Sequence, residues 1–322
     1  MLGGLARRVS LVEKTRAEGK PVLVVDSGDL FFEAGESTDP QRDLTKARLL
    51  SRAYRKMGVV AVNVGDLDLA HGLDFLRQEA SQGLPLISAN LLDAAKKSPI
   101  FPPFVIKDVS GIRVAFLGLT HPDLRPIAQK VVADSIVVKD PIEAARETME
   151  KLRGKADYVV LLSDLGVSKE LDVVKAAPGI HFVLGGHDGR YVSSPHQEGK
   201  TPIVQSYYKG MYVGRLRLTL ENPPSSFQDE GAQERLQQQV TNVDVQLSRL
   251  QKAAERQSTP QLQQSIQQLV QQKAQLEDQL KQLSSSPPKG NRFHWSLQSL
   301  DPTLPENEDV RGWVREAGID RD

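Results

Sequence analysis

Four apolar runs of this chain each end in acidic or histidine residues beside glycine. The four segments are Asp26-Ser-Gly-Asp29, Gly65-Asp66-Leu67-Asp68, Ser163-Asp164-Leu-Gly166 and Gly186-His187-Asp188-Gly189. In open α/β sheets, binding sites form just beyond the carboxyl ends of the strands. One aspartate at such a point is usually a turn or helix-capping residue. Four such turns in regular order indicate a metal site.

The elements that must position these turns are predicted from the apolar pattern. Continuous apolar runs, which suit strands buried on both faces, occupy residues 21–25, 59–64, 84–89, 112–117, 158–162 and 180–184. Residues 41–57, 72–80, 141–153 and 169–177 have helical spacing. Alternating strands and helices predict a layered α/β domain over residues 1–222. Residues 212–220 alternate in polarity, which predicts a half-exposed antiparallel strand.

A glutamine-rich segment follows, and it has a period. Leucine, isoleucine and valine recur at heptad a and d spacing in two runs, 236–250 and 262–283, with Lys273 in one polar position. Ser258-Thr-Pro260 between the runs is typical of a new helix start. We expect an antiparallel helical hairpin with Pro/Ser hinges over residues 223–290. An intermolecular coiled coil and a disordered tract are the alternatives.

The last segment, 291–322, is predicted to return to the first domain. Phe293, Trp295 and Leu297 alternate as in a strand, and a short helix is expected near residues 310–317. The simplest arrangement pairs 292–299 with 212–220, so that the hairpin is an insertion between two neighbouring strands. Its outer faces are mostly glutamine, so we expect it to protrude and to dock an unidentified protein partner.

Composition excludes several classes of function. Lysine plus arginine equals aspartate plus glutamate at 41 each, so net charge favours neither nucleic acid nor an anionic membrane as the main partner. The chain has no cysteine, which excludes disulfides, thiol catalysis and cysteine zinc sites. No apolar run approaches the length of a membrane span.

The order of the acidic turns resembles the calcineurin-like metallophosphoesterases, and among them the 5'-nucleotidase group. That family's pattern is D-x-H, then G-D, G-N-H-D/E, a lone histidine and G-H-x-H. Leu86-Ile-Ser-Ala-Asn-Leu and Gly179-Ile-His-Phe-Val-Leu-Gly-Gly-His resemble the group's connecting segments. The resemblance covers residues 1–220. It implies a layered sandwich, a two-metal site and hydrolysis of phosphomonoesters such as nucleotides.

Carried over by position, the resemblance implies a depleted ligand set. Asp29 matches the bridging aspartate and His187 the first histidine of G-H-x-H, whereas Gly189 replaces the second. Asp66 and Asp164 replace an asparagine and a histidine. Leu67 stands where the family has the histidine that protonates the leaving group. The D-x-H motif would lie upstream of residue 1, and the helical pattern that begins at Leu5 leads us to expect upstream sequence.

Ligand counting sets the expected function. Asp29, Asp66, Asp164 and His187 could hold one hard divalent cation, Mg²⁺, Mn²⁺ or Ca²⁺, or no ion at all. We therefore expect hydrolysis to be lost or strongly reduced. The alternatives are a divergent active phosphoesterase with an altered metal site and a scaffold that acts through its coiled-coil arm. Relatives in this family are commonly exported, which implies a cell-envelope or periplasmic location for a full-length form.

Overall fold

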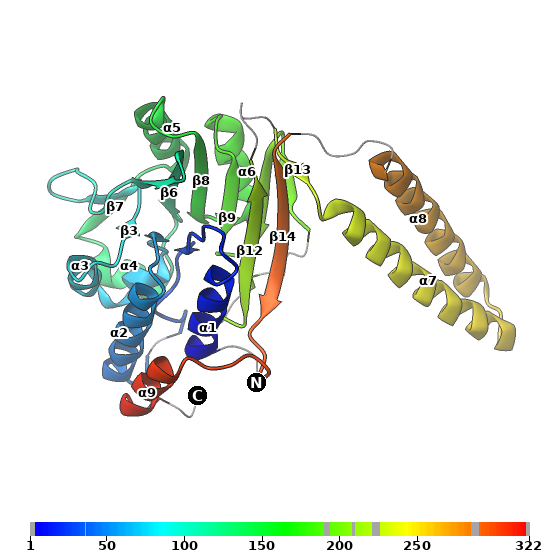
Figure 1. The fold of residues 1–322 in the computed structure, drawn as a ribbon, viewed down its shortest axis with the longest axis horizontal. Coiled ribbons are helices and arrows are strands. Elements are labelled where there is room, and N and C mark those ends of the chain that lie inside the picture. The colour runs from blue at the N-terminus through cyan, green and yellow to red at the C-terminus, as the bar shows by residue number, and fades with distance from the viewer. Residues whose placement is uncertain are drawn as a thin grey trace. The chain divides into compact units, whose positions relative to one another are not determined.

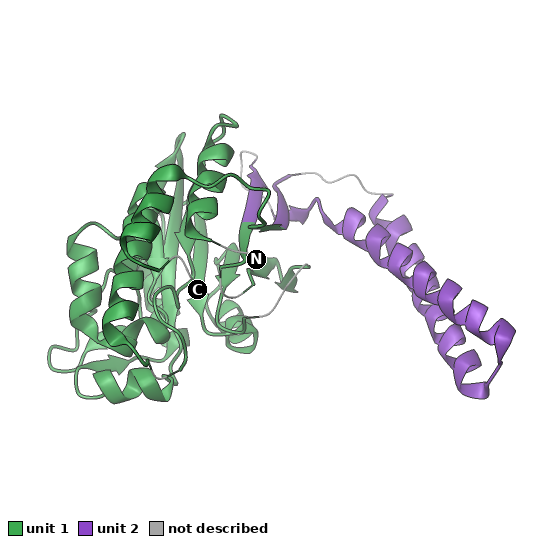
Figure 2. Ribbon diagram, turned by 90° about the horizontal axis from the view of Figure 1, so that it is seen from below, with its two compact units in different colours: residues 1–214, 297–322 green, residues 215–296 purple. Residues whose placement is uncertain are grey.

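A computed structural model describes residues 4–35, 37–189, 194–207, 210–220, 226–284 and 290–319. Contacts divide the chain into two compact units, residues 1–214 with 297–322 and residues 215–296, coloured separately in Figure 2. The predicted Pro/Ser hinges fall largely outside the described residues. Within the described residues, no helix has both the length and the apolar character needed to cross a membrane.

The first unit is built on two sheets, shown in Figure 1. The smaller has the order β1-β2-β3 and is parallel. Its strands are β1 (Val25–Asp26), β2 (Ala61–Asn63) and β3 (Leu86–Ile87). The larger has the order β10-β11-β9-β8-β6-β5. Its strands are β5 (Phe104–Val109), β6 (Ile112–Thr120), β8 (Tyr158–Asp164), β9 (Phe182–Gly185), β10 (His196–Glu198) and β11 (Thr201–Gln205). A further pair, β4 (Leu91–Asp93) with β7 (Ile136–Val138), is antiparallel.

The parallel register of the larger sheet brings its strand ends to one edge. Thr120 of β6 lies opposite Asp164 of β8, and Ser163 lies opposite Gly185 of β9. Gly185 in turn lies opposite Gln205 of β11. The turn that carries His187 therefore begins beside the end of β8, as the strand-end argument requires.

Helices cover the two sheets and create two cores. Those of this unit are α1 (Leu5–Arg16), α2 (Pro40–Lys56), α3 (Leu73–Ser81), α4 (Pro126–Val132), α5 (Pro141–Leu152), α6 (Val167–Ala176) and α9 (Glu308–Glu316), with the 3₁₀ helix η1 (Leu67–His71). One core packs β1–β3 against α1–α4 and α9, and the other packs β6, β8, β9 and β11 against α5 and α6. Burial of apolar side chains at these faces is the main stabilising contribution.

Helix starts follow the capping chemistry of the sequence. Asp39 accepts a hydrogen bond from Arg42 N at 3.0 Å ahead of Pro40, and Asp140 accepts one from Glu143 N at 2.9 Å ahead of Pro141. Carboxylate caps and proline at the first helical position both favour a helix start. These caps set the beginnings of α2 and α5.

The second unit contains two helices of 25 residues each, α7 (Ala232–Arg256) and α8 (Pro260–Ser284), which contact one another. Lys273 Nζ of α8 lies 2.6 Å from Asp244 Oδ1 of α7, so the lysine at the polar heptad position forms an ion pair with the other helix. A three-stranded sheet with the order β12-β14-β13 accompanies them. Its strands are β12 (Tyr212–Thr219), β13 (Gln228–Asp229) and β14 (Arg292–Ser299), and the two units share β12 and β14. The predicted domain boundaries and the reading of α7 and α8 as an inserted coiled coil stay predictions.

A carboxylate and histidine cluster bridged by an arginine

Two glycine turns bring the first two aspartates together. A Cβ atom at Gly28 would lie 2.8 Å from Gly65 N, and one at Gly65 would lie 2.3 Å from Asp29 Oδ1. Only glycine fits both positions, because real Cβ atoms do not approach other atoms so closely. Asp29 itself has φ 55°, a left-handed conformation that aspartate tolerates better than most residues. The backbones of the two turns are therefore in direct contact.

Asp68 holds the two turns together through hydrogen bonds to their backbone N–H groups. Its carboxylate accepts hydrogen bonds from Asp29 N at 3.0 Å, Phe31 N at 2.9 Å and Gly65 N at 2.9 Å. Burial, and then the charge of Asp29, raise the pKa of Asp68 well above its usual range. The sequence placed Asp68 in the motif but did not show this role, which is to satisfy three backbone donors rather than to face the cluster.

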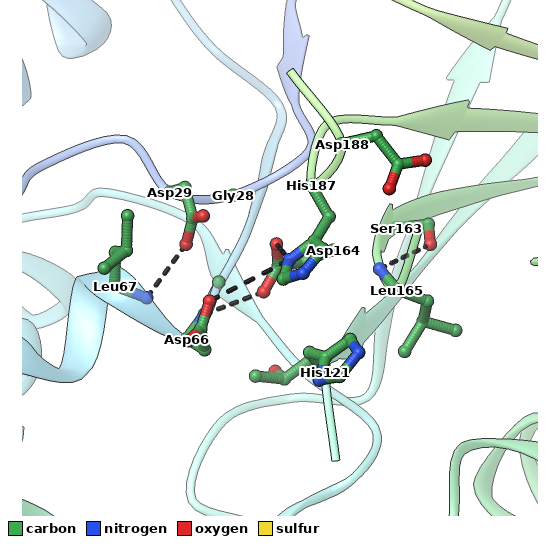
Figure 3. A network of polar contacts seen from close by, with 12 residues as sticks. Gly28, Asp29, Asp66, Leu67, His121, Ser163, Asp164, Leu165, His187 and Asp188 are labelled. Carbon is green, nitrogen blue, oxygen red and sulfur yellow. Dashed lines mark hydrogen bonds and ion pairs between the residues drawn. The ribbon is translucent and has the colours of Figure 1, made fainter. Parts of the chain in front are cut away.

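The structure brings together the four residues that the sequence singled out. Asp29, Asp66, Asp164 and His187 each offer a ligand atom, and these atoms all lie within 4.8 Å of one another. Figure 3 shows their side chains turned toward a common point at the strand ends. Asp66 N donates to Asp164 Oδ2 at 2.8 Å, and His187 Nδ1 lies 3.0 Å from Asp164 Oδ1. The cluster thus joins turns from both sheets.

Arg125, which was not predicted from the sequence, lies among these carboxylates. Arg125 Nη1 donates to Asp29 Oδ2 at 2.8 Å and to Asp66 Oδ1 at 2.9 Å. Its backbone N–H donates to Asp66 Oδ2 at 2.8 Å, and Nη2 lies 3.4 Å from His187 Nδ1. Arg125 precedes Pro126 at the start of α4, in the loop that leaves the end of β6. The one available signal was its place after a strand end and before a helix-starting proline.

The charges of the cluster oppose one another. Burial, followed by the charge of Asp66, raises the pKa of Asp29, and Arg125 counteracts this shift. Burial, followed by the charges of Asp29 and Asp66, raises the pKa of Asp164 well above its usual range. Burial disfavours the charge on Arg125, but its bonds to Asp29 and its attraction to the other carboxylates raise its pKa overall. Ionised carboxylates in one site are stable together only beside a positive charge, and otherwise one of them binds a proton.

Carboxylate oxygens are suitable ligands for a hard divalent cation, but the hydrogen bonds of these three carboxylates leave no oxygen available for one. Asp29 accepts from Leu67 N at 2.9 Å and from Arg125, Asp66 accepts twice from Arg125, and Asp164 is bonded to Asp66 N and His187. All six carboxylate oxygens therefore have a partner within the protein. An ion that needs several of these oxygens would have to displace the Arg125 side chain. As they stand, these residues do not fit a divalent ion.

Two other histidines lie in different places. The ring of His121 stacks on that of His187, with 4.5 Å between ring centroids and 7° between planes. Its Nδ1 is engaged with Asp123 in the loop, and burial lowers the pKa of His121. The ring of His71 instead lies against that of Phe32, with 4.3 Å between ring centroids and 32° between planes. The contact between His121 and His187 depends on the path of the loop after β6 and is not evident from the sequence.

Comparison with known proteins finds relatives of the kind that the motif order resembles. No family model matches the chain. A 5'-nucleotidase of Vibrio cholerae is 27% identical over 255 residues, covering 68% of this chain and 45% of that protein. The metallophosphoesterase YunD of Bacillus subtilis is 29% identical over 231 residues, covering 70% of this chain and 48% of that protein. The calcineurin-like phosphoesterase YfkN of Bacillus subtilis superposes with a TM-score of 0.64 at 19% identity, covering 98% of this chain and 88% of that structure.

The relatives found by sequence are named as a 5'-nucleotidase and a metallophosphoesterase, and the fold is similar to that of a calcineurin-like phosphoesterase. The resemblance inferred from the strand-end motifs is thereby confirmed, and so is the layered α/β fold. The chain spans about half the length of the curated relatives it matches.

Proposed function

We propose that this chain is a 5'-nucleotidase-like metallophosphoesterase domain in which hydrolysis of phosphomonoesters is lost or strongly reduced. The observation that supports the proposal is Leu67. The family resemblance places a proton-donating histidine at this position, and Leu67 is an aliphatic residue with 8% exposure. The one polar group that Leu67 directs at the cluster is its backbone N–H, which donates to Asp29 Oδ1 at 2.9 Å.

The absence of a proton-donating histidine at position 67 is expected to lower the rate of hydrolysis. A positioned general acid contributes about 10²–10⁴-fold to a rate. The alcohol group of a phosphomonoester departs as an alkoxide unless a proton reaches its oxygen, and the side chain of Leu67 has no proton to give. Arg125, which is bonded to Asp29 and Asp66, should reduce hydrolysis further, because it competes for the oxygens that would hold a catalytic cation.

A divergent active phosphoesterase is the second candidate, and His121 favours it. Its ring lies against His187 at the rim of the cluster, where an imidazole could supply a proton in place of the missing histidine. In that case hydrolysis would depend on His121 and on an altered metal site. This candidate makes a different prediction about one substitution, so the two can be separated.

The test is hydrolysis of adenosine monophosphate, whose alkoxide leaving group needs a proton, with Mn²⁺ or Mg²⁺ added. We expect no phosphate release above that of a matched Asp164→Asn variant. Turnover in the usual enzyme range of roughly 1–10³ per second, abolished by Asp164→Asn, would contradict the proposal. If such turnover were also abolished by His121→Ala, the second candidate would replace it.

The helices α7 and α8 suggest how a non-catalytic domain could act. We infer that they form an arm that docks a protein partner, because most of their surface is exposed glutamine with scattered charge. The heptad positions Val240 and Val243 are buried, whereas Val245 and Val270, which lie off the seam, are exposed. A cell-envelope location remains part of this proposal and rests on the family resemblance alone.

A further inference from the structure

The guanidinium of Arg125 has the position and the bonding of a cation ligated by the cluster. One nitrogen, Nη1, donates to two different carboxylates at 2.8 and 2.9 Å. Asp66 is fully buried and the side chain of Asp29 is 18% exposed, whereas that of Arg125 is 27% exposed. The bonds therefore lie in a largely desolvated place, where charge-assisted hydrogen bonds are strong.

Arg125 is also held there by its backbone. Its N–H donates to Asp66 Oδ2, and its carbonyl accepts from Ala128 N at 3.0 Å and Gln129 N at 2.9 Å. Pro126 follows it as the first residue of α4, which restricts its backbone to an extended conformation. An arginine fixed in this way is part of the site rather than a surface side chain that reaches it by chance.

Electrostatics explains why the cluster needs such a group. Asp29, Asp66 and Asp164 offer carboxylate oxygens that lie within 4.8 Å of one another, and the three groups cannot all be ionised without a nearby positive charge. A divalent ion would meet this need, and so does a guanidinium, which stays charged at every pH where proteins are folded. The two solutions exclude each other because they use the same oxygens of Asp29 and Asp66.

We propose that Arg125 is a tethered counter-cation that takes the place of a divalent metal ion. On this account the wild-type chain has no divalent site at the cluster, and removal of the guanidinium creates one from Asp29, Asp66 and Asp164. The proposal concerns the same cluster as the proposed function. Its test measures cation binding and heat stability instead of hydrolysis, so either proposal can fail alone.

The experiment is isothermal titration of metal-depleted protein with MnCl₂. The variants are Arg125→Gln, which keeps much of the side-chain volume, and Arg113→Gln as a charge-matched control. Arg113 is 43% exposed and paired with Asp157 at 2.8 Å. We expect Arg125→Gln to bind one Mn²⁺ at least about tenfold more tightly than wild type or control. Adding Asp164→Asn to Arg125→Gln should abolish the gained binding.

Thermal unfolding with and without Mn²⁺ is the second measurement. Arg125→Gln should unfold at a lower temperature than wild type in EDTA, and Mn²⁺ should restore much of the loss. If the variant folds only when Mn²⁺ is present, that result also supports the proposal. Equal Mn²⁺ affinity in wild type and Arg125→Gln would overturn it. So would an Arg125→Gln variant that neither binds Mn²⁺ nor gains heat stability from it.

Discussion

Glu170 gives the sharpest prediction of pH-dependent stability. It lies on α6 with 1% exposure, and neither carboxylate oxygen has a well-formed hydrogen bond within the described part of the chain. The carboxylate of Glu170 packs against Gly185 of β9, so closely that a Cβ atom at Gly185 would lie 2.6 Å from Glu170 Oε1. Burial raises the pKa of Glu170 to about 7 from its ordinary 4.5, although the Ser163 hydroxyl opposes part of the shift.

The sign and size of the effect follow from proton linkage. Below pH 4.5 Glu170 is protonated in the folded and the unfolded chain, so its favourable contribution is fully present. Between pH 4.5 and 7 the folded chain keeps a proton that the unfolded chain releases, so stability falls as pH rises. A shift from 4.5 to about 7, at 1.36 kcal/mol per pKa unit, corresponds to about 3 kcal/mol.

Glu170→Gln replaces the neutral acid with a neutral amide of similar shape and removes the titration. We expect the free energy of unfolding of the variant, relative to wild type, to rise by about 3 kcal/mol between pH 4.5 and pH 8. Urea denaturation at several pH values measures this. Glu150→Gln, at a carboxylate that is 65% exposed, is the control. Parallel stability profiles of wild type and Glu170→Gln across this range would show that the pKa of Glu170 is not raised in the folded chain.

Two further predictions concern the core and the second unit. Gly118→Ala should destabilise the protein by about 1–3 kcal/mol in denaturant, because its Cβ would lie 2.6 Å from Asn63 Oδ1 and 2.9 Å from the carbonyl oxygen of Ile87; unchanged stability would show that the two sheets can separate there. Leu247→Asp should melt α7 and α8 and lower the circular dichroism at 222 nm, whereas Val245→Asp, at a 46% exposed position, should leave the helical signal intact; equal losses in both variants would contradict the predicted heptad seam.

The cluster was predictable from sequence because strand ends obey a simple rule. Parallel strands with continuous apolar runs align their carboxyl ends, and the register of Thr120 with Asp164 shows this alignment. Asp29, Asp66, Asp164 and His187 could therefore be placed together from their positions after apolar runs. The bounds of α2 and α5 were also close, since an aspartate cap and a proline mark the start of each in the sequence.

Arg125 could not be predicted in the same way. Its position depends on the path of the loop after β6 and on the start of the short helix α4, neither of which has a periodic signal. Two short strands were not predicted from the sequence for a similar reason. The strands β4 and β7 have three residues each, too few to show alternation. Tertiary contacts, rather than local pattern, define these features.

A crystal structure from crystals grown in MnCl₂, with anomalous diffraction measured at the manganese edge, would show whether Arg125 or a divalent ion neutralises the cluster. We expect no anomalous peak at the cluster and a guanidinium of Arg125 within hydrogen-bonding distance of Asp29 and Asp66, about 2.7–3.2 Å. A manganese peak at about 2.0–2.6 Å from oxygens of Asp29, Asp66 and Asp164, with the Arg125 side chain displaced, would contradict it.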